Sequence, residues 1–139
     1  MPLVAPAGPR ERRLLAIGVL LLAALGLALY ARYPTYPAYD SLTAFSWGRD
    51  IIDGRLPAFD AFRAPTQHPL LLALGVVLEP AGSAAARIWV VLCVLSLVAL
   101  VTAMFRLGRV AAGVLGGLVA AALIASRLNF ALLTTLGFL

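Results

Sequence analysis

The sequence predicts an all-α integral membrane protein with three transmembrane helices, part of a fourth, and a long outer loop that carries juxtamembrane amphipathic helices. Three observations lead to this prediction. Hydrophobic residues make up 63% of the chain, and a mean hydropathy of +0.99 is typical of a chain that water solvates poorly. Apolar runs of membrane-spanning length recur along the sequence. Five of the six acidic residues and the single histidine lie in one segment, residues 32–87.

The chain begins with a basic segment, residues 1–13, which is followed by the first expected transmembrane helix at residues 14–31. The run from Leu14 to Tyr30 has no charged residue, and at about 1.5 Å per residue it just crosses a hydrocarbon core of about 30 Å. A cleaved signal peptide is the alternative interpretation. It is less favoured, because the run is longer than the usual apolar region of about 7–15 residues, and Leu29-Tyr30-Ala31 is a poor cleavage site.

The second and third transmembrane helices are expected at residues 88–105 and 110–125, joined by a cytoplasmic hairpin at residues 106–109. Residues 126–139 begin a further apolar helix, and the sequence stays apolar up to Leu139. A stretch of that length is too short to span a bilayer. We therefore expect that this helix is truncated and that the chain is the N-terminal part of a longer protein.

Arginine placement favours a cytoplasmic N-terminus, because loops on that side collect basic residues close to the spans. Five arginines crowd into two short segments beside the expected spans, namely Arg10, Arg12, Arg13, Arg106 and Arg109. The sequence thus predicts a protein of the bacterial inner (plasma) membrane with its N-terminus inside. No basic stripe is interleaved with aromatic residues, so no nucleic-acid partner is expected.

The third expected span carries small residues at helical spacing. Gly113 and Gly117 lie four residues apart, which is typical of a face that packs closely against another transmembrane helix. The alternative is that small residues are simply common in this alanine-rich chain. Cys93 is the single cysteine, so the sequence offers neither an internal disulfide nor a thiolate metal cluster.

The outer loop, residues 32–87, contains two expected interfacial helices at about residues 40–53 and 67–79. The second is apolar but too short to cross a membrane. Asp40 has two interpretations: it is the N-cap of the first helix, or it is a buried base near the membrane surface. Arg63 and His68 are two potential phosphate-binding groups near the start of the second helix.

The order of these elements resembles the N-terminal end of the GT-C superfamily of membrane glycosyltransferases, of the mannosyltransferase-like kind that take a sugar from a polyprenyl phosphate. The resemblance covers most of the chain. It rests on a first span followed by an acidic residue, a helix ending in Gly-Arg, a His-Pro step and a short helix before the second span, here Tyr39-Asp40, Gly54-Arg55, His68-Pro69 and Ala86-Arg87-Ile88-Trp89.

The resemblance implies that Asp40 accepts the proton of the acceptor hydroxyl, and that Arg63 and His68 neutralise the donor phosphate. Many family members carry a second acid beside the first, whereas here Ser41 follows Asp40. A lone carboxylate is a poor divalent-cation site, so no metal or other cofactor is expected.

The partners that the sequence predicts are membrane lipid and a polyprenyl-phosphate-linked sugar donor. Family members have many more spans, so we expect these residues alone to be inactive. The alternative function is a non-enzymatic helical module that packs with a partner membrane protein through the Gly113 and Gly117 face.

Overall fold

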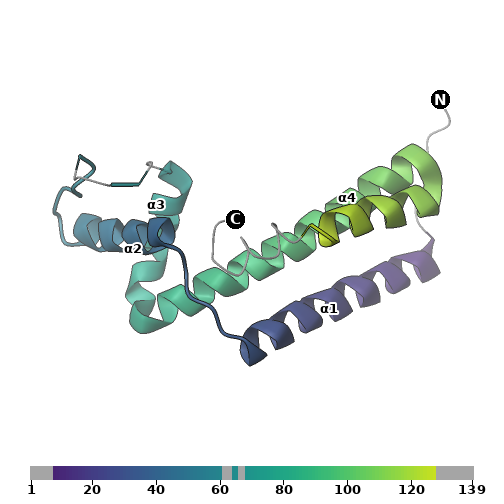
Figure 1. The fold of residues 1–139 in the computed structure, drawn as a ribbon, viewed down its shortest axis with the longest axis horizontal. Coiled ribbons are helices and arrows are strands. Elements are labelled where there is room, and N and C mark those ends of the chain that lie inside the picture. The colour runs from purple at the N-terminus through teal and green to yellow at the C-terminus, as the bar shows by residue number, and fades with distance from the viewer. Residues whose placement is uncertain (1–7, 61–63, 66–67, 128–139) are drawn as a thin grey trace. The chain divides into compact units, whose positions relative to one another are not determined.

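The computed structural model describes residues 8–60, 64–65 and 68–127. In these ranges every regular element is helical, which confirms the all-α class (Figure 1). The elements in chain order are α1 (Pro9–Arg32), α2 (Tyr39–Ile52), α3 (Pro69–Leu78), the short 3-10 helix η1 (Glu79–Ala84) and α4 (Ala85–Ala125). The chain divides into two compact units: α1 with residues 94–125 of α4, and α2, α3 and η1 with residues 85–93.

Among the described residues, two helical stretches are long and apolar enough to cross a membrane. The first, Arg12–Arg32, lies in α1 and contains the whole of the expected span at residues 14–31. α1 begins with Pro9 in its first turn, where the missing N–H costs no hydrogen bond, and Tyr33 closes it by donating its N–H to the Leu29 carbonyl at 2.8 Å. No residue of the stretch is buried inside the protein.

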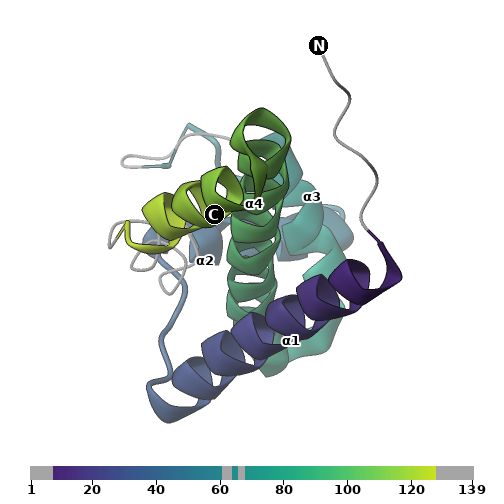
Figure 2. The same ribbon diagram turned by 90° about the vertical axis from the view of Figure 1, so that its right-hand side faces the viewer.

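The second stretch, Pro69–Ala125, joins α3, η1 and α4. α4 leaves helical geometry at Ala112 and Gly113, where the chain turns back on itself (Figure 2). Gly113 has φ 73° and ψ −167°, a backbone region that is essentially restricted to glycine. Residues 106–109, which were expected to form a hairpin, are therefore helical, and the chain reverses a few residues later at Ala112 and Gly113.

The two arms of α4 on either side of Gly113 lie in close contact. A Cβ added to Gly108 would lie 2.5 Å from the Gly116 carbonyl oxygen, and one added to Gly117 would lie 2.7 Å from the Phe105 carbonyl oxygen. Contacts this short are possible only because glycine has no side chain. The arm after the reversal, residues 114–125, is about 18 Å long at 1.5 Å per residue, which is shorter than a bilayer core.

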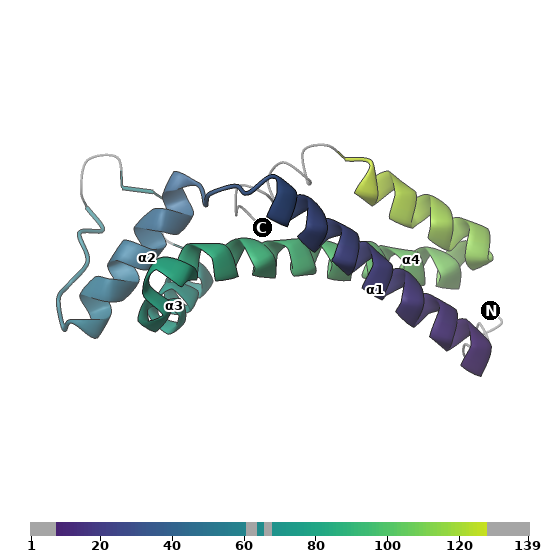
Figure 3. The ribbon, with the colours of Figure 1, turned by 90° about the horizontal axis from the view of Figure 1, so that it is seen from below.

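In the other unit, α2 and α3 cross (Figure 3), and the residue of each helix at the crossing is a glycine. A Cβ added to Gly48 would lie 2.5 Å from the Gly75 carbonyl carbon and 2.7 Å from the Val76 nitrogen, and one added to Gly75 would collide with the Ala44 carbonyl oxygen. The two backbones are therefore in direct contact.

The small core of this unit lies beside the crossing. Phe45 of α2 packs edge-on against Trp89 of α4, with ring centroids 6.4 Å apart, and Cys93 completes the buried cluster. Three α3 leucines pack against it: Leu71, Leu74 and Leu78. Ser41, which is only 1% exposed, accepts a 3.2 Å hydrogen bond from the Trp89 indole N–H. The first turn of α2 is thereby tied to the first turns of α4.

Candidate functional site

Asp40 lies in the first turn of α2, because the helix begins at Tyr39 and its N-cap is Ala38. The structure thus does not use Asp40 as the helix N-cap, which was one of its two interpretations. A carboxylate in a first turn is still favoured by the positive end of the helix dipole. The side chain is half-buried and lines a small pocket.

Asp40 and His68 line this same pocket, although they come from different helices. Its volume is about 90 Å³, and the rest of its wall is apolar: Ala44, Trp47, Pro65, Pro69, Leu71 and Leu72. Sites that enclose a whole small molecule measure about 300–1,000 Å³. The pocket can therefore admit a hydroxyl or a few small groups, and a sugar would need further walls around it.

The glycine crossing explains why these two side chains meet. Asp40, Ala44 and Gly48 are spaced four residues apart, so they follow one face of α2. Gly48 and Ala44 contact Gly75 of α3, and this contact holds the preceding turns of the two helices next to each other. The pocket lies between those turns, and residues of both helices line it.

His68 is the N-cap residue of α3, with extended backbone angles of φ −113° and ψ 99°. Its carbonyl accepts the Leu72 N–H at 2.9 Å, and its side chain is exposed. The imidazole therefore stands at the positive end of a helix, where a negatively charged group is stabilised. Arg63, the other expected phosphate ligand, lies outside the described residues.

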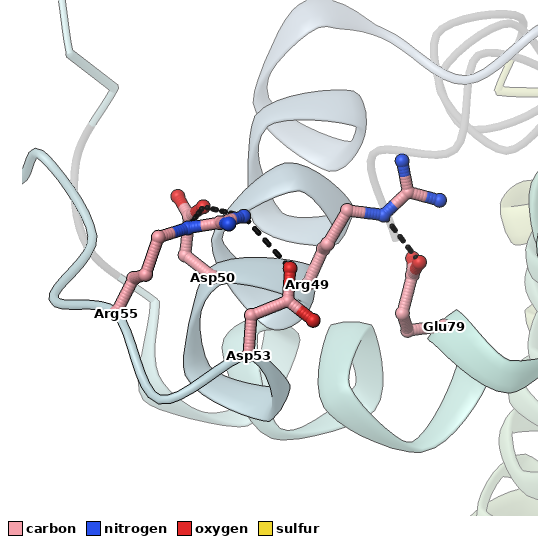
Figure 4. Close-up of polar contacts among 5 residues, drawn as sticks. All are labelled: Arg49, Asp50, Asp53, Arg55 and Glu79. Carbon is pink, nitrogen blue, oxygen red and sulfur yellow. Dashed lines mark hydrogen bonds and ion pairs between the residues drawn. The ribbon is translucent and has the colours of Figure 1, made fainter.

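A cluster of ion pairs lies at the far end of α2 (Figure 4). Arg49 donates from Nε to Glu79 Oε1 at 2.6 Å, and this hydrogen bond raises the pKa of the Arg49 guanidinium. Arg55 pairs with Asp50 at 3.0 Å and with Asp53 at 2.8 Å. The sequence did not predict the pair of Arg49 with Glu79, since a contact across 30 residues leaves no local pattern.

The site has no metal-binding arrangement in the described part of the chain, where no three His, Cys, Asp or Glu side chains come together. Ser41, the residue after Asp40, is buried and accepts a hydrogen bond from Trp89.

The expected packing face on residues 110–125 differs in the structure. A Cβ on Gly113 would meet nothing within 4 Å, and its positive φ makes it the turn residue instead. Gly117 does pack closely, but against Phe105 of the same chain. The small residues at this place close an internal hairpin.

Comparisons with protein-family models, with curated proteins and with solved structures found no match for this chain.

Proposed function

We propose that this chain is part of an integral membrane glycosyltransferase, and that the pocket between Asp40 and His68 is one wall of its sugar-transfer site. The observation that carries the proposal is that both residues line one pocket. A carboxylate and an imidazole beside a helix N-terminus suit a reaction in which one group accepts a proton and the other stabilises a departing phosphate.

In the proposed reaction the donor is a polyprenyl-phosphate-linked sugar and the acceptor supplies a hydroxyl. The acceptor oxygen forms a bond to the anomeric carbon as the bond from that carbon to the phosphate oxygen breaks. The hydroxyl proton passes to the Asp40 carboxylate. The polyprenyl phosphate leaves as an anion, to which the His68 imidazole donates a hydrogen bond. The apolar pocket wall strengthens both interactions, because it lowers the local dielectric constant.

The proposed topology places this pocket outside the cytoplasm. Arg10, Arg12 and Arg13 lie in the first turns of α1, so the positive-inside rule keeps the N-terminus in the cytoplasm. α1 then crosses the membrane once, and the segment that follows it emerges on the opposite side. Lipid-linked donors and extracytoplasmic acceptors can both reach a site there.

The alternative, a module that binds a partner helix through a small-residue face, receives less support. Gly117 packs inside the α4 hairpin, and Gly116 faces Gly108 in the same contact. These residues are consequently already covered by the chain itself, and a partner helix would have to displace one arm of the hairpin.

The experiment compares Asp40→Asn with Asp60→Asn in the full-length protein, reconstituted with a polyprenyl-phosphate sugar and an acceptor extract. Asp60 is an exposed carboxylate in the same loop that does not line the pocket. Loss of a general base typically lowers the rate by about 10²–10⁴-fold, and we expect this loss for Asp40→Asn alone. Equal rates for the two variants would remove Asp40 from the reaction.

A further inference from the structure

The outward side of α3 is apolar along its whole length. Leu70 is 76% exposed and Val77 is 70% exposed, and Ala73 is exposed between them. The three residues are spaced at i, i+3 and i+7, so they form one stripe along the helix. Pro80, at the start of η1, continues the exposed apolar surface. We call Leu70, Ala73 and Val77 the α3 stripe.

The outward side of α2 is different. Its exposed residues include the polar Ser46 and Arg49 beside apolar and aromatic ones, namely Tyr39, Leu42, Ile51 and Ile52. Arg49 is 62% exposed even while it pairs with Glu79. α2 therefore presents both polar and apolar side chains, whereas the exposed side chains of α3 are apolar throughout.

We infer that α3 lies in the boundary layer of a lipid bilayer with the α3 stripe among the acyl chains, while α2 covers its water-facing side. α3 has ten residues, or about 15 Å, which is half of a hydrocarbon core and too short to cross it. An apolar helix of this length with polar ends lies along the membrane plane, about 5–10 Å into the boundary.

Three observations favour lipid over a protein as the occupant. α3 continues through η1 into α4 as one apolar stretch that is able to cross a membrane, so the bilayer is next to it along the chain. The stripe has no polar side chain that could specify a protein partner. Polar groups stand at both ends of α3, with His68 before it and the Arg49–Glu79 pair after it, as expected for a helix whose ends reach the headgroups.

This placement concerns the surface of α3 and is independent of the proposed reaction. It does give the pocket two sides: His68 starts the lipid-side helix, and Asp40 belongs to the water-side helix. A lipid-linked phosphate and a water-soluble hydroxyl would then reach the pocket from opposite directions.

The test uses Ala73→Cys, Val77→Cys and the matched control Ser46→Cys in the full chain, each labelled with a small fluorophore. Cys93 is 1% exposed, so the parent protein should take up little label. The labelled proteins are reconstituted in phosphatidylcholine and phosphatidylglycerol vesicles. Quenching is then measured with nitroxide-bearing lipids and with iodide that has been equilibrated across the vesicle wall.

We expect lipid nitroxides to quench positions 73 and 77 at least about twofold more than position 46, and iodide to give the reverse order, since a stripe at this depth contacts acyl chains. Quenching of positions 73 and 77 by iodide, with none by the lipid probe, would overturn the inference. Shielding of these positions from both quenchers would also overturn it, because a protein partner or a second copy would then cover the stripe.

Discussion

Replacing Gly48 with alanine tests the crossing that holds the pocket together. The new Cβ would lie 2.5 Å from the Gly75 carbonyl carbon and 2.7 Å from the Val76 nitrogen, whereas ordinary van der Waals contact begins at 3.4 Å. The colliding atoms belong to the backbone, so no rotamer change relieves the overlap. The two helices must move apart by about 1 Å, and overpacking of this kind costs about 1–3 kcal/mol.

A gain in helix propensity partly offsets that cost. Alanine is favoured over glycine inside a helix by about 0.5–1 kcal/mol, so the net loss of unfolding free energy should be about 1–2 kcal/mol. Gly18→Ala is the matched control, because a Cβ at Gly18 would meet nothing within 4 Å. That variant keeps the propensity gain without the clash and should be neutral or slightly stabilising.

Cys93 provides the assay, since it is buried in the cluster with Phe45 and Trp89. A maleimide dye can label it only when this unit opens, so the labelling rate reports the open population. A loss of 1–2 kcal/mol should raise the rate by about 5–30-fold. A Cys93 labelling rate in Gly48→Ala equal to that of the parent protein, or equal to that of Gly18→Ala, would refute the backbone contact between α2 and α3.

Three further substitutions probe other contacts. Gly113→Ala should lower the unfolding free energy by about 1–3 kcal/mol, because φ 73° with ψ −167° is strained for alanine; a thermal melt of the reconstituted protein measures it, and an unchanged midpoint would contradict the turn. Trp89→Phe removes the hydrogen bond to Ser41, and should cost about 1 kcal/mol and speed Cys93 labelling several-fold; unchanged labelling would mean that the bond is not formed. Arg49→Gln should weaken the contact between α2 and η1 and so lower the unfolding free energy slightly. This loss relative to the parent protein should become smaller in about 1 M salt. Glu79 raises the pKa of Arg49, so the stabilisation is present below the ordinary arginine pKa and is lost only above it. The effect should therefore be flat between about pH 6 and 9, and a steep change in that window would point to another group.

The sequence predicted the helical class because apolar periodicity and proline positions act locally. Helices were expected at about residues 40–53 and 67–79, and the structure has them at Tyr39–Ile52 and Pro69–Leu78. Pro69 explains the later start of the second helix, since proline fits the first turn and the residue before it avoids helical angles.

The chain reversal was misplaced for a physical reason. Arg106 and Arg109 looked like a polar loop between two spans, but arginines with long apolar stems are tolerated inside helices. The turn requires a positive φ, and Gly113 supplies it. The spacing of Gly113 and Gly117 resembled a packing motif, whereas in the structure Gly113 is the turn residue and Gly117 packs against Phe105.

The candidate site was only partly predictable. Asp40 and His68 could be named from the resemblance, but their common pocket depends on a contact between Gly48 and Gly75. Such a contact is a property of two helices together, and neither glycine stands out within its own helix. The Arg49–Glu79 pair was missed for the same reason.

The most direct test of the account is a double-mutant cycle on sugar transfer with Asp40→Asn, His68→Gln and the double variant in the full-length protein. If both residues act on one transfer step in one pocket, each single change should lower the rate strongly, and the double variant should be little worse than the poorer single one. Rates that fall by the product of the two single effects would show that the residues act independently, and would contradict a shared site.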